Sequence, residues 1–190
     1  MLSILAGFMI GIGAIVYLTV GGVAGALLFA VGLMTICCFK MELFTGKVGL
    51  FAEGKIDCLG MIRIWFGNFI GVLIAAMLIL STHRGEMLSE TARNIVAIKV
   101  AATPVENFIL GVFCGLLMFV AVSGYSEHRN ILFVYVPVAV FILSGFNHCV
   151  ADMFYLSLGA QNANDFLILI PITLGNVVGG SIIPLVRRSV

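Results

Sequence analysis

Long apolar segments constrain this chain more than any other feature of its sequence. Six mostly apolar stretches follow one another, at roughly 3–20, 22–39, 60–81, 104–124, 131–158 and 166–186. An α-helix needs about 20 such residues to cross the hydrocarbon core of a bilayer. Hydrophobic residues make up 62% of the chain and charged residues 10%, whereas soluble domains have about 45–50% and about 25%. The sequence therefore predicts an all-α protein with six transmembrane helices in the lipid bilayer, and excludes a soluble enzyme or a nucleic-acid-binding protein.

The gaps between these stretches are short, which predicts one transmembrane domain over residues 1–190. No basic residue precedes the first stretch, so we expect a retained span and not a cleaved signal peptide. Loops on the cytoplasmic side of a membrane carry an excess of Lys and Arg. The predicted loops of one side contain Lys47, Lys55, Arg63, Arg129, Arg187 and Arg188, and those of the other side contain Arg84, Arg93 and Lys99. This bias predicts that both termini are cytoplasmic.

The chain repeats itself weakly, which indicates two halves of three spans each. The Gly-Asn-x-x-Gly pattern at 67–71 recurs at 175–179, an offset of 108 residues. Residues 6–11 loosely match 110–115. Halves with an odd number of spans have opposite topologies, so we predict inverted repeats over about 1–99 and about 100–190, as is common in transport proteins. The pattern also fits close helix packing through small residues, and both interpretations can hold together.

Polar residues interrupt the second and fifth spans at corresponding positions of the two halves. The first interruption covers residues 39–47 and the second covers residues 144–148. Irregular backbone at membrane depth is tolerated where it lines a cavity or lies inside protein. We therefore predict broken second and fifth helices around a central binding or conduction site. The alternative for the first interruption is an interfacial loop in which Lys40 and Lys47 extend to water.

Four motifs in order resemble those of the formate/nitrite transporter family. They are Leu-Phe-Thr-Gly at 43–46, Trp-Phe-Gly-Asn-Phe-Ile-Gly at 65–71, the Ser-Gly-Phe-Asn-His segment at 144–154, and the final-helix segment at 170–180. The resemblance implies a homopentameric, aquaporin-like channel in a bacterial or archaeal cell membrane, with a pore in each protomer. It implies transport of a small monovalent anion, with formate first and nitrite or hydrosulfide as alternatives.

The resemblance also implies roles for individual residues. It assigns the pore to His148, Thr45, Lys99, Asn147 and Gly115. It assigns an outer constriction to Phe29, Leu33 and Phe141, and an inner one to Leu43 and Phe44. It suggests supporting roles for Glu106, Asp152, Asn68 and Asn176. The family's cytoplasmic N-terminal helix has no counterpart before the first span, so gating by such a helix is not expected.

Three positions depart from the family pattern. Gly115 stands where an asparagine is usual near the pore, Asn147 stands where a glutamate is usual, and Asp152 replaces the usual asparagine. The acidic residue has thus moved by about one helical turn. From its position one turn beyond His148, we expect Asp152 either to orient that histidine or to hold a backbone amide.

The chemistry of a dry pore favours permeation assisted by a proton. Removing an ion from water costs several kcal/mol even after relaxation, so a neutral acid passes an apolar constriction far more easily than its anion. His148 is a candidate proton donor, because imidazole has the unperturbed pKa nearest physiological pH. Alternatively, bulk water supplies the proton and His148 is a polar anchor. Lys99 either attracts anions to the outer vestibule or is a loop cation that extends to water.

Two other classes of protein remain as alternatives, a membrane thiol oxidoreductase and a structural protein without transport. An oxidoreductase needs a reactive thiol pair or a cofactor motif, and adjacent Cys37 and Cys38 are a poor pair. The sequence shows no cofactor motif, and His148 with Asp152 lacks the further ligands of a metal site. We therefore expect a channel that is not an enzyme and holds no cofactor or metal.

Overall fold

The computed structural model describes residues 1–188, and these residues form helices without any strand. The helices are α1 (Leu2–Val20), α2 (Gly22–Cys38), α3 (Phe44–Ala52), α4 (Cys58–Leu80), α5 (Gly85–Ala101), α6 (Pro104–His128), α7 (Leu132–Leu143), α8 (Cys149–Gly159), the 3-10 helix η1 (Ala163–Ile168) and α9 (Leu169–Arg188).

Four helical segments of the described chain are long and apolar enough to cross a membrane. They are α1, α4, α6 and the continuous segment made by η1 and α9, which agree with four of the six predicted stretches. The other two stretches are divided: α2 ends at Cys38 before α3 begins at Phe44, and α7 ends at Leu143 before α8 begins at Cys149. The second polar interruption therefore coincides with a non-helical segment, and the first, at 39–47, covers a non-helical segment and the first turn of α3.

The sequence did not predict α5, which lies in the region expected to be a loop. This helix contains Glu, Arg, Lys and Asn residues as well as apolar ones, so a search for long apolar stretches passes over it. Its buried side chains Leu88, Ala92 and Val96 recur every four residues and form one face. That face packs against α8. The helical backbone fixes the direction in which Lys99, near the end of α5, extends.

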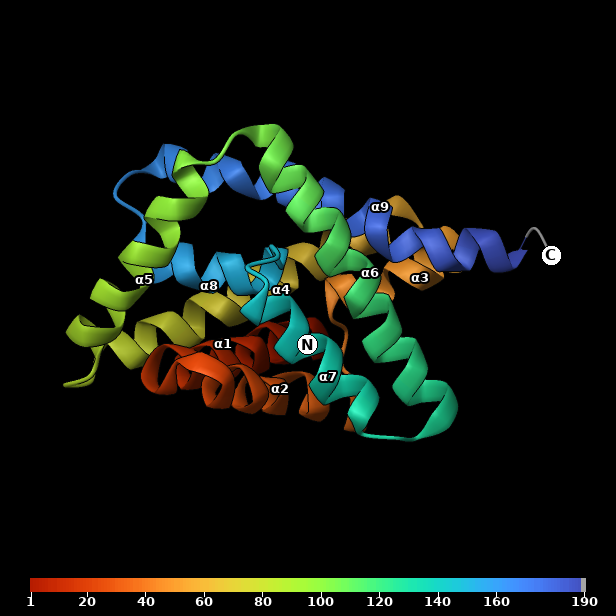
Figure 1. The fold of residues 1–190 in the computed structure, drawn as a ribbon, viewed down its shortest axis with the longest axis horizontal. Coiled ribbons are helices and arrows are strands. Elements are labelled where there is room, and N and C mark those ends of the chain that lie inside the picture. The colour runs from red at the N-terminus through yellow and green to blue at the C-terminus, as the bar shows by residue number, and fades with distance from the viewer. Residues whose placement is uncertain (189–190) are drawn as a thin grey trace.

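The long helices pack in two pairs, α1 with α4 and α6 with α9. In Figure 1, α5 lies at the opposite end of the molecule from α3 and from the C-terminal part of α9. The short helices contact the long pairs, α3 against α9 and α8 against α4. The ends of the two non-helical segments that lead into α3 and α8 are buried in the bundle, at Leu43, Asn147 and His148.

Close backbone contacts repeat between the two pairs with the 108-residue offset. A Cβ atom added to Gly7 would lie 1.9 Å from the carbonyl oxygen of Asn68, and one added to Gly115 would lie 2.3 Å from that of Asn176. The partner of Gly7 in the second half is thus Gly115, so the loose alignment of 6–11 with 110–115 was out of register by four residues. Gly115 lies in a helix contact because only a residue without a side chain fits there.

Replacing Gly115 with alanine is expected to lower the free energy of unfolding by about 1–3 kcal/mol, because the new methyl group overlaps the backbone of α9. Thermal unfolding of the purified protein in detergent measures this loss. Gly46→Ala is the matched control, since its Cβ atom would meet side-chain atoms and no backbone, the nearest being a methyl group of Val122 at 3.2 Å. Equal midpoints for the two variants would contradict the packing role of Gly115.

Candidate functional site

Asn68 fixes the start of α3. Its Oδ1 accepts a hydrogen bond from the backbone N–H of Phe44 at 2.8 Å. Its Nδ2 donates to the carbonyl oxygens of Ser3 at 2.7 Å and Glu42 at 2.8 Å. The side chain is completely buried. One amide thus holds α1, the first non-helical segment and the N-terminus of α3 together.

Asn176 fixes the start of α8 in the same way as Asn68 fixes that of α3. Its Oδ1 accepts from the backbone N–H of Cys149 at 2.9 Å, and its Nδ2 donates to the carbonyl oxygens of Gly111 and Asn147, both at 2.8 Å. Gly111 follows Ser3 by the same 108 residues that separate the two asparagines. Both asparagines therefore act as supports that position the segments around the site.

His148 and Thr45 join the two short helices. Thr45 lies in the first turn of α3, His148 is the N-cap residue of α8, and Thr45 Oγ1 lies 2.9 Å from His148 Nε2. Both side chains are buried. The N-termini of α3 and α8 therefore meet at this contact, and the positive ends of their helix dipoles favour negative charge there.

The cap hydrogen bond determines which nitrogen of His148 carries hydrogen. The backbone N–H of Ala151 donates to His148 Nδ1 at 3.1 Å, so Nδ1 acts as an acceptor. A neutral imidazole with Nδ1 as acceptor carries its hydrogen on Nε2. His148 therefore donates to Thr45, and adding a proton to Nδ1 would break the cap of α8.

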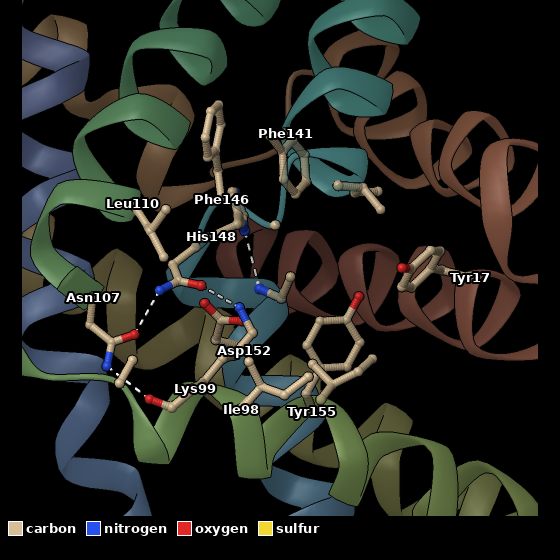
Figure 2. A pocket seen from close by; sticks show the side chains of 16 residues that line it. Tyr17, Ile98, Lys99, Asn107, Leu110, Phe141, Phe146, His148, Asp152 and Tyr155 are labelled. Atoms are coloured by element: carbon tan, nitrogen blue, oxygen red, sulfur yellow. Dashed lines mark hydrogen bonds and ion pairs between the residues drawn. The ribbon is translucent and has the colours of Figure 1, made fainter.

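A cavity of about 260 Å³ lies beside His148, and we call it the Lys99 cavity. Figure 2 shows Lys99, Asp152 and His148 directed toward it from α5 and α8. Its polar lining consists of Lys99, Asn107, Asn147, His148 and Asp152, and Phe141, Tyr17 and Tyr155 contribute aromatic rings. The cavity can therefore present both charge and hydrogen-bonding groups to a small molecule.

Lys99 is the centre of a buried polar network in this cavity (Figure 2). Its ammonium group donates to Asn147 Oδ1 and forms an ion pair with Asp152 Oδ1 at 2.9 Å. Asn147 Nδ2 donates to Asn107 Oδ1 at 2.7 Å, and Asn107 Nδ2 donates to the carbonyl oxygen of Lys99 at 2.9 Å. Only 14% of the Lys99 side chain is exposed, so Lys99 is not a loop cation that extends to water.

Asp152 plays neither of the roles that were expected from its spacing. Its Oδ1 pairs with Lys99, and its Oδ2 is buried and receives no hydrogen bond from residues 1–188. The nitrogens of His148 are engaged by Thr45 and Ala151 instead. The reason is the unpredicted helix α5, which brings the Lys99 ammonium group to the carboxylate.

A second cavity of about 320 Å³ lies where α2, α3 and α6 come together. We call it the Lys40 cavity, because Lys40, Lys47 and Arg129 line it. Leu43 and Gly46, on either side of Thr45, also line it. The contact between Thr45 and His148 therefore connects the walls of the two cavities, one of which carries three cationic residues.

The predicted constriction residues lie in three different places. Phe141 lines the Lys99 cavity, and its ring stacks on His148 with 5.6 Å between centroids. Phe29 packs edge-on against Phe141 at 5.9 Å, and Leu33 is completely buried. Leu43 lines the Lys40 cavity. Phe44 lies instead in an apolar groove between α4 and α9, because Asn68 holds its backbone at the start of α3.

Two further predicted site residues, Glu106 and Gly115, are not among the described residues that line either cavity. Glu106 is exposed, and it caps α6 by accepting hydrogen bonds from the backbone and hydroxyl of Thr103, both at 2.7 Å. Gly115 packs on Asn176, as described above. Sequence reasoning missed Asn107 and Arg129 as lining residues, because the place of each depends on packing between helices.

Comparison with known proteins agrees with the motifs. The family model described as formate/nitrite transporter matches residues 1–188. The chain belongs to the formate/nitrite transporter family. The formate channel FocA of Haemophilus influenzae is 32% identical over 198 residues, which cover 83% of this chain and 70% of that protein. FocA of Escherichia coli (strain K12) is 26% identical over 235 residues, which cover 96% and 82%.

Solved structures of this family share the fold. A structure described as a pentameric formate channel with formate bound has a TM-score of 0.83 and 27% identity, covering 99% of this chain and 94% of its own. A second, described as an FNT family ion channel, has a TM-score of 0.85 and 23% identity, covering 98% and 87%. This member of the formate/nitrite transporter family is therefore an integral membrane protein with several transmembrane helices, and its family is one of channels and transporters.

Proposed function

We propose that this member of the formate/nitrite transporter family conducts a small weak acid across a cell membrane, with formate as the first candidate. The observation that carries the proposal is the contact between Thr45 and His148, where the N-termini of two short helices meet between two cavities. Similarity to formate channels supports formate over nitrite or hydrosulfide.

The proposed membrane arrangement has six spans in one domain, built from two inverted repeats of three spans. In this arrangement α2 with α3 and α7 with α8 form the broken second and fifth spans. The shared 108-residue offset of Gly7 and Gly115, and of Asn68 and Asn176, supports the repeats. The Lys and Arg bias favours both termini on the cytoplasmic side. Similarity to formate channels of Haemophilus influenzae and Escherichia coli supports a bacterial or archaeal cell membrane. Similarity to the pentameric formate channel supports a homopentamer with a pore in each protomer.

In the proposed mechanism, cations in both cavities attract the anion and apolar side chains block it in charged form. Lys99 is the cation on one side, and Lys40, Lys47 and Arg129 are those on the other. Phe141 and Leu43 place apolar surface along the path. The substrate crosses this region with a proton, because a bare anion would lose several kcal/mol of hydration. His148 offers its Nε2–H as a hydrogen-bond donor, and its cap hydrogen bond favours the anchor role over that of proton donor.

Transport by the purified protein in liposomes tests this function. Formate uptake is expected to rise as external pH falls, because more of the substrate is then protonated. His148→Phe is expected to lower the initial rate at least about tenfold, since one hydrogen bond in a dry pore is worth about 1.5 kcal/mol. Parallel uptake of nitrite and hydrosulfide ranks the substrates.

Met77→Ala is the control for this experiment. Met77 is 68% exposed on α4, so its replacement with alanine is expected to leave formate uptake unchanged. Uptake by His148→Phe at the normal rate would exclude both the donor and the anchor role of the histidine. Absence of uptake of all three substrates by the unmodified protein would exclude the proposed function.

A further inference from the structure

Asp152 holds a buried oxygen atom that no group among residues 1–188 contacts through a hydrogen bond. The residue is 1% exposed, and only its Oδ1 is engaged, by the ammonium group of Lys99. Oδ2 is buried without a donor. A buried acceptor without a donor is costly. This oxygen is therefore a place in the Lys99 cavity where a proton would be stabilised.

The ion pair also controls whether Lys99 can attract an anion. With Asp152 ionised, the charges of Lys99 and Asp152 cancel, and an incoming anion meets a carboxylate beside the lysine of this cavity. With Asp152 protonated, the charge of Lys99 is uncompensated and attracts the anion. Binding of a proton and binding of an anion therefore favour each other.

The other titratable groups around Asp152 do not offer an equivalent place for a proton. Tyr17 on α1, Cys114 on α6, and Cys149 and Tyr155 on α8 lie near it, and a phenol or thiol already carries its own hydrogen, unlike the free carboxylate oxygen of Asp152. His148 Nδ1 is occupied by the Ala151 N–H. The residues that α6 and α7 contribute to the cavity lining are uncharged.

We propose that Asp152 carries the proton that enters the Lys99 cavity with each substrate anion, an inference that rests on the proposed function. A proton from the outer solution adds to Oδ2, the ion pair opens, and the anion binds the Lys99 ammonium group. The O–H bond of Asp152 then breaks as the O–H bond of the weak acid forms. Asp152 and Lys99 pair again, and the neutral acid is released toward His148. No other reactant is needed.

The departures from the family pattern provide the variants that test this. Asp152→Asn removes the carboxylate and leaves Lys99 charged. The double variant Asn147→Asp with Asp152→Asn keeps a counter-ion for Lys99, because Asn147 Oδ1 already accepts its hydrogen bond. In the double variant the second carboxylate oxygen faces the side chain of Asn107, whose amide can rotate to donate to it, so this carboxylate has a donor at each oxygen.

The measurement is the KM for formate in liposomes from mildly acidic to mildly alkaline pH. In the unmodified protein we expect KM to rise about tenfold per pH unit, because one proton binds with each anion. In Asp152→Asn, the KM at alkaline pH is expected to fall at least about tenfold, since the anion binds Lys99 without a proton. In the double variant the KM is expected to stay high and to change less than about twofold per pH unit.

Opposite shifts of the two variants at alkaline pH would not result from a general loss of folding. A pH dependence of KM that is the same in all three proteins would overturn the role of Asp152 and leave the proposed function intact. If Asp152→Asn does not fold, the double variant alone tests the role of Asp152. Loss of the pH dependence of KM in the double variant then supports this role, and retention of the pH dependence overturns it. Absence of formate uptake by the unmodified protein would contradict the proposed function itself, and with it this inference.

Discussion

Replacing Lys99 with methionine is expected to lower the free energy of unfolding by about 3–5 kcal/mol, because Asp152 then stays buried without its counter-ion. Methionine has a similar length and keeps the apolar contacts of the lysine stem. Thermal unfolding in detergent at neutral pH measures the loss. The loss should shrink as pH falls, because a protonated Asp152 needs no counter-ion.

The double variant Lys99→Met with Asp152→Asn is the control for this prediction. It removes both charges of the pair, so it should recover most of the lost stability. A double variant as unstable as Lys99→Met would show that packing of the lysine stem, and not charge, is what matters. The single variant should also reduce formate uptake, since the cavity loses its cation.

Replacing Asn176 with leucine is expected to lower the free energy of unfolding by at least about 3 kcal/mol. The replacement leaves three backbone groups without this partner, the N–H of Cys149 and the carbonyl oxygens of Gly111 and Asn147. The start of α8 and the position of His148 depend on these bonds, so uptake should fall together with stability. Thermal unfolding and liposome uptake of the same preparation measure both.

Asn68→Leu should behave similarly, since Asn68 makes the corresponding bonds to Phe44, Ser3 and Glu42. Asn164→Ala is the control, because Asn164 is exposed and lies outside the site; it should change stability by less than about 0.5 kcal/mol. Wild-type stability in Asn176→Leu would contradict the role given to these two asparagines.

Hydropathy predicted most of the fold because the bilayer imposes the length of a span on the sequence. The same reasoning missed α5, whose buried face is narrow and whose other residues are polar. It also placed Gly115 near the pore, whereas the 108-residue repeat makes it the partner of Gly7 in a helix contact.

The predicted site residues also fall into two groups, those that lie together at the site and those that the structure places elsewhere. The resemblance assigned both His148 and Thr45 to the pore, and their side chains lie within hydrogen-bond distance of each other. Phe44 was expected at the inner constriction and lies in an apolar groove. Adjacent residues of one motif can thus point to different sides of a helix, and the motif alone does not say which side faces the path.

The sequence by itself determined that the chain spans a membrane several times, that it belongs to the formate/nitrite transporter family, and which segments interrupt the apolar stretches. These properties follow from composition, apolar length and local motifs, which are readable along the chain. Only the tertiary structure decided that Asp152 pairs with Lys99 and that Ala151 occupies one nitrogen of His148. The first of these contacts joins α5 to α8, residues 53 positions apart. The second depends on the angle at which α8 begins, so both follow from how the helices pack.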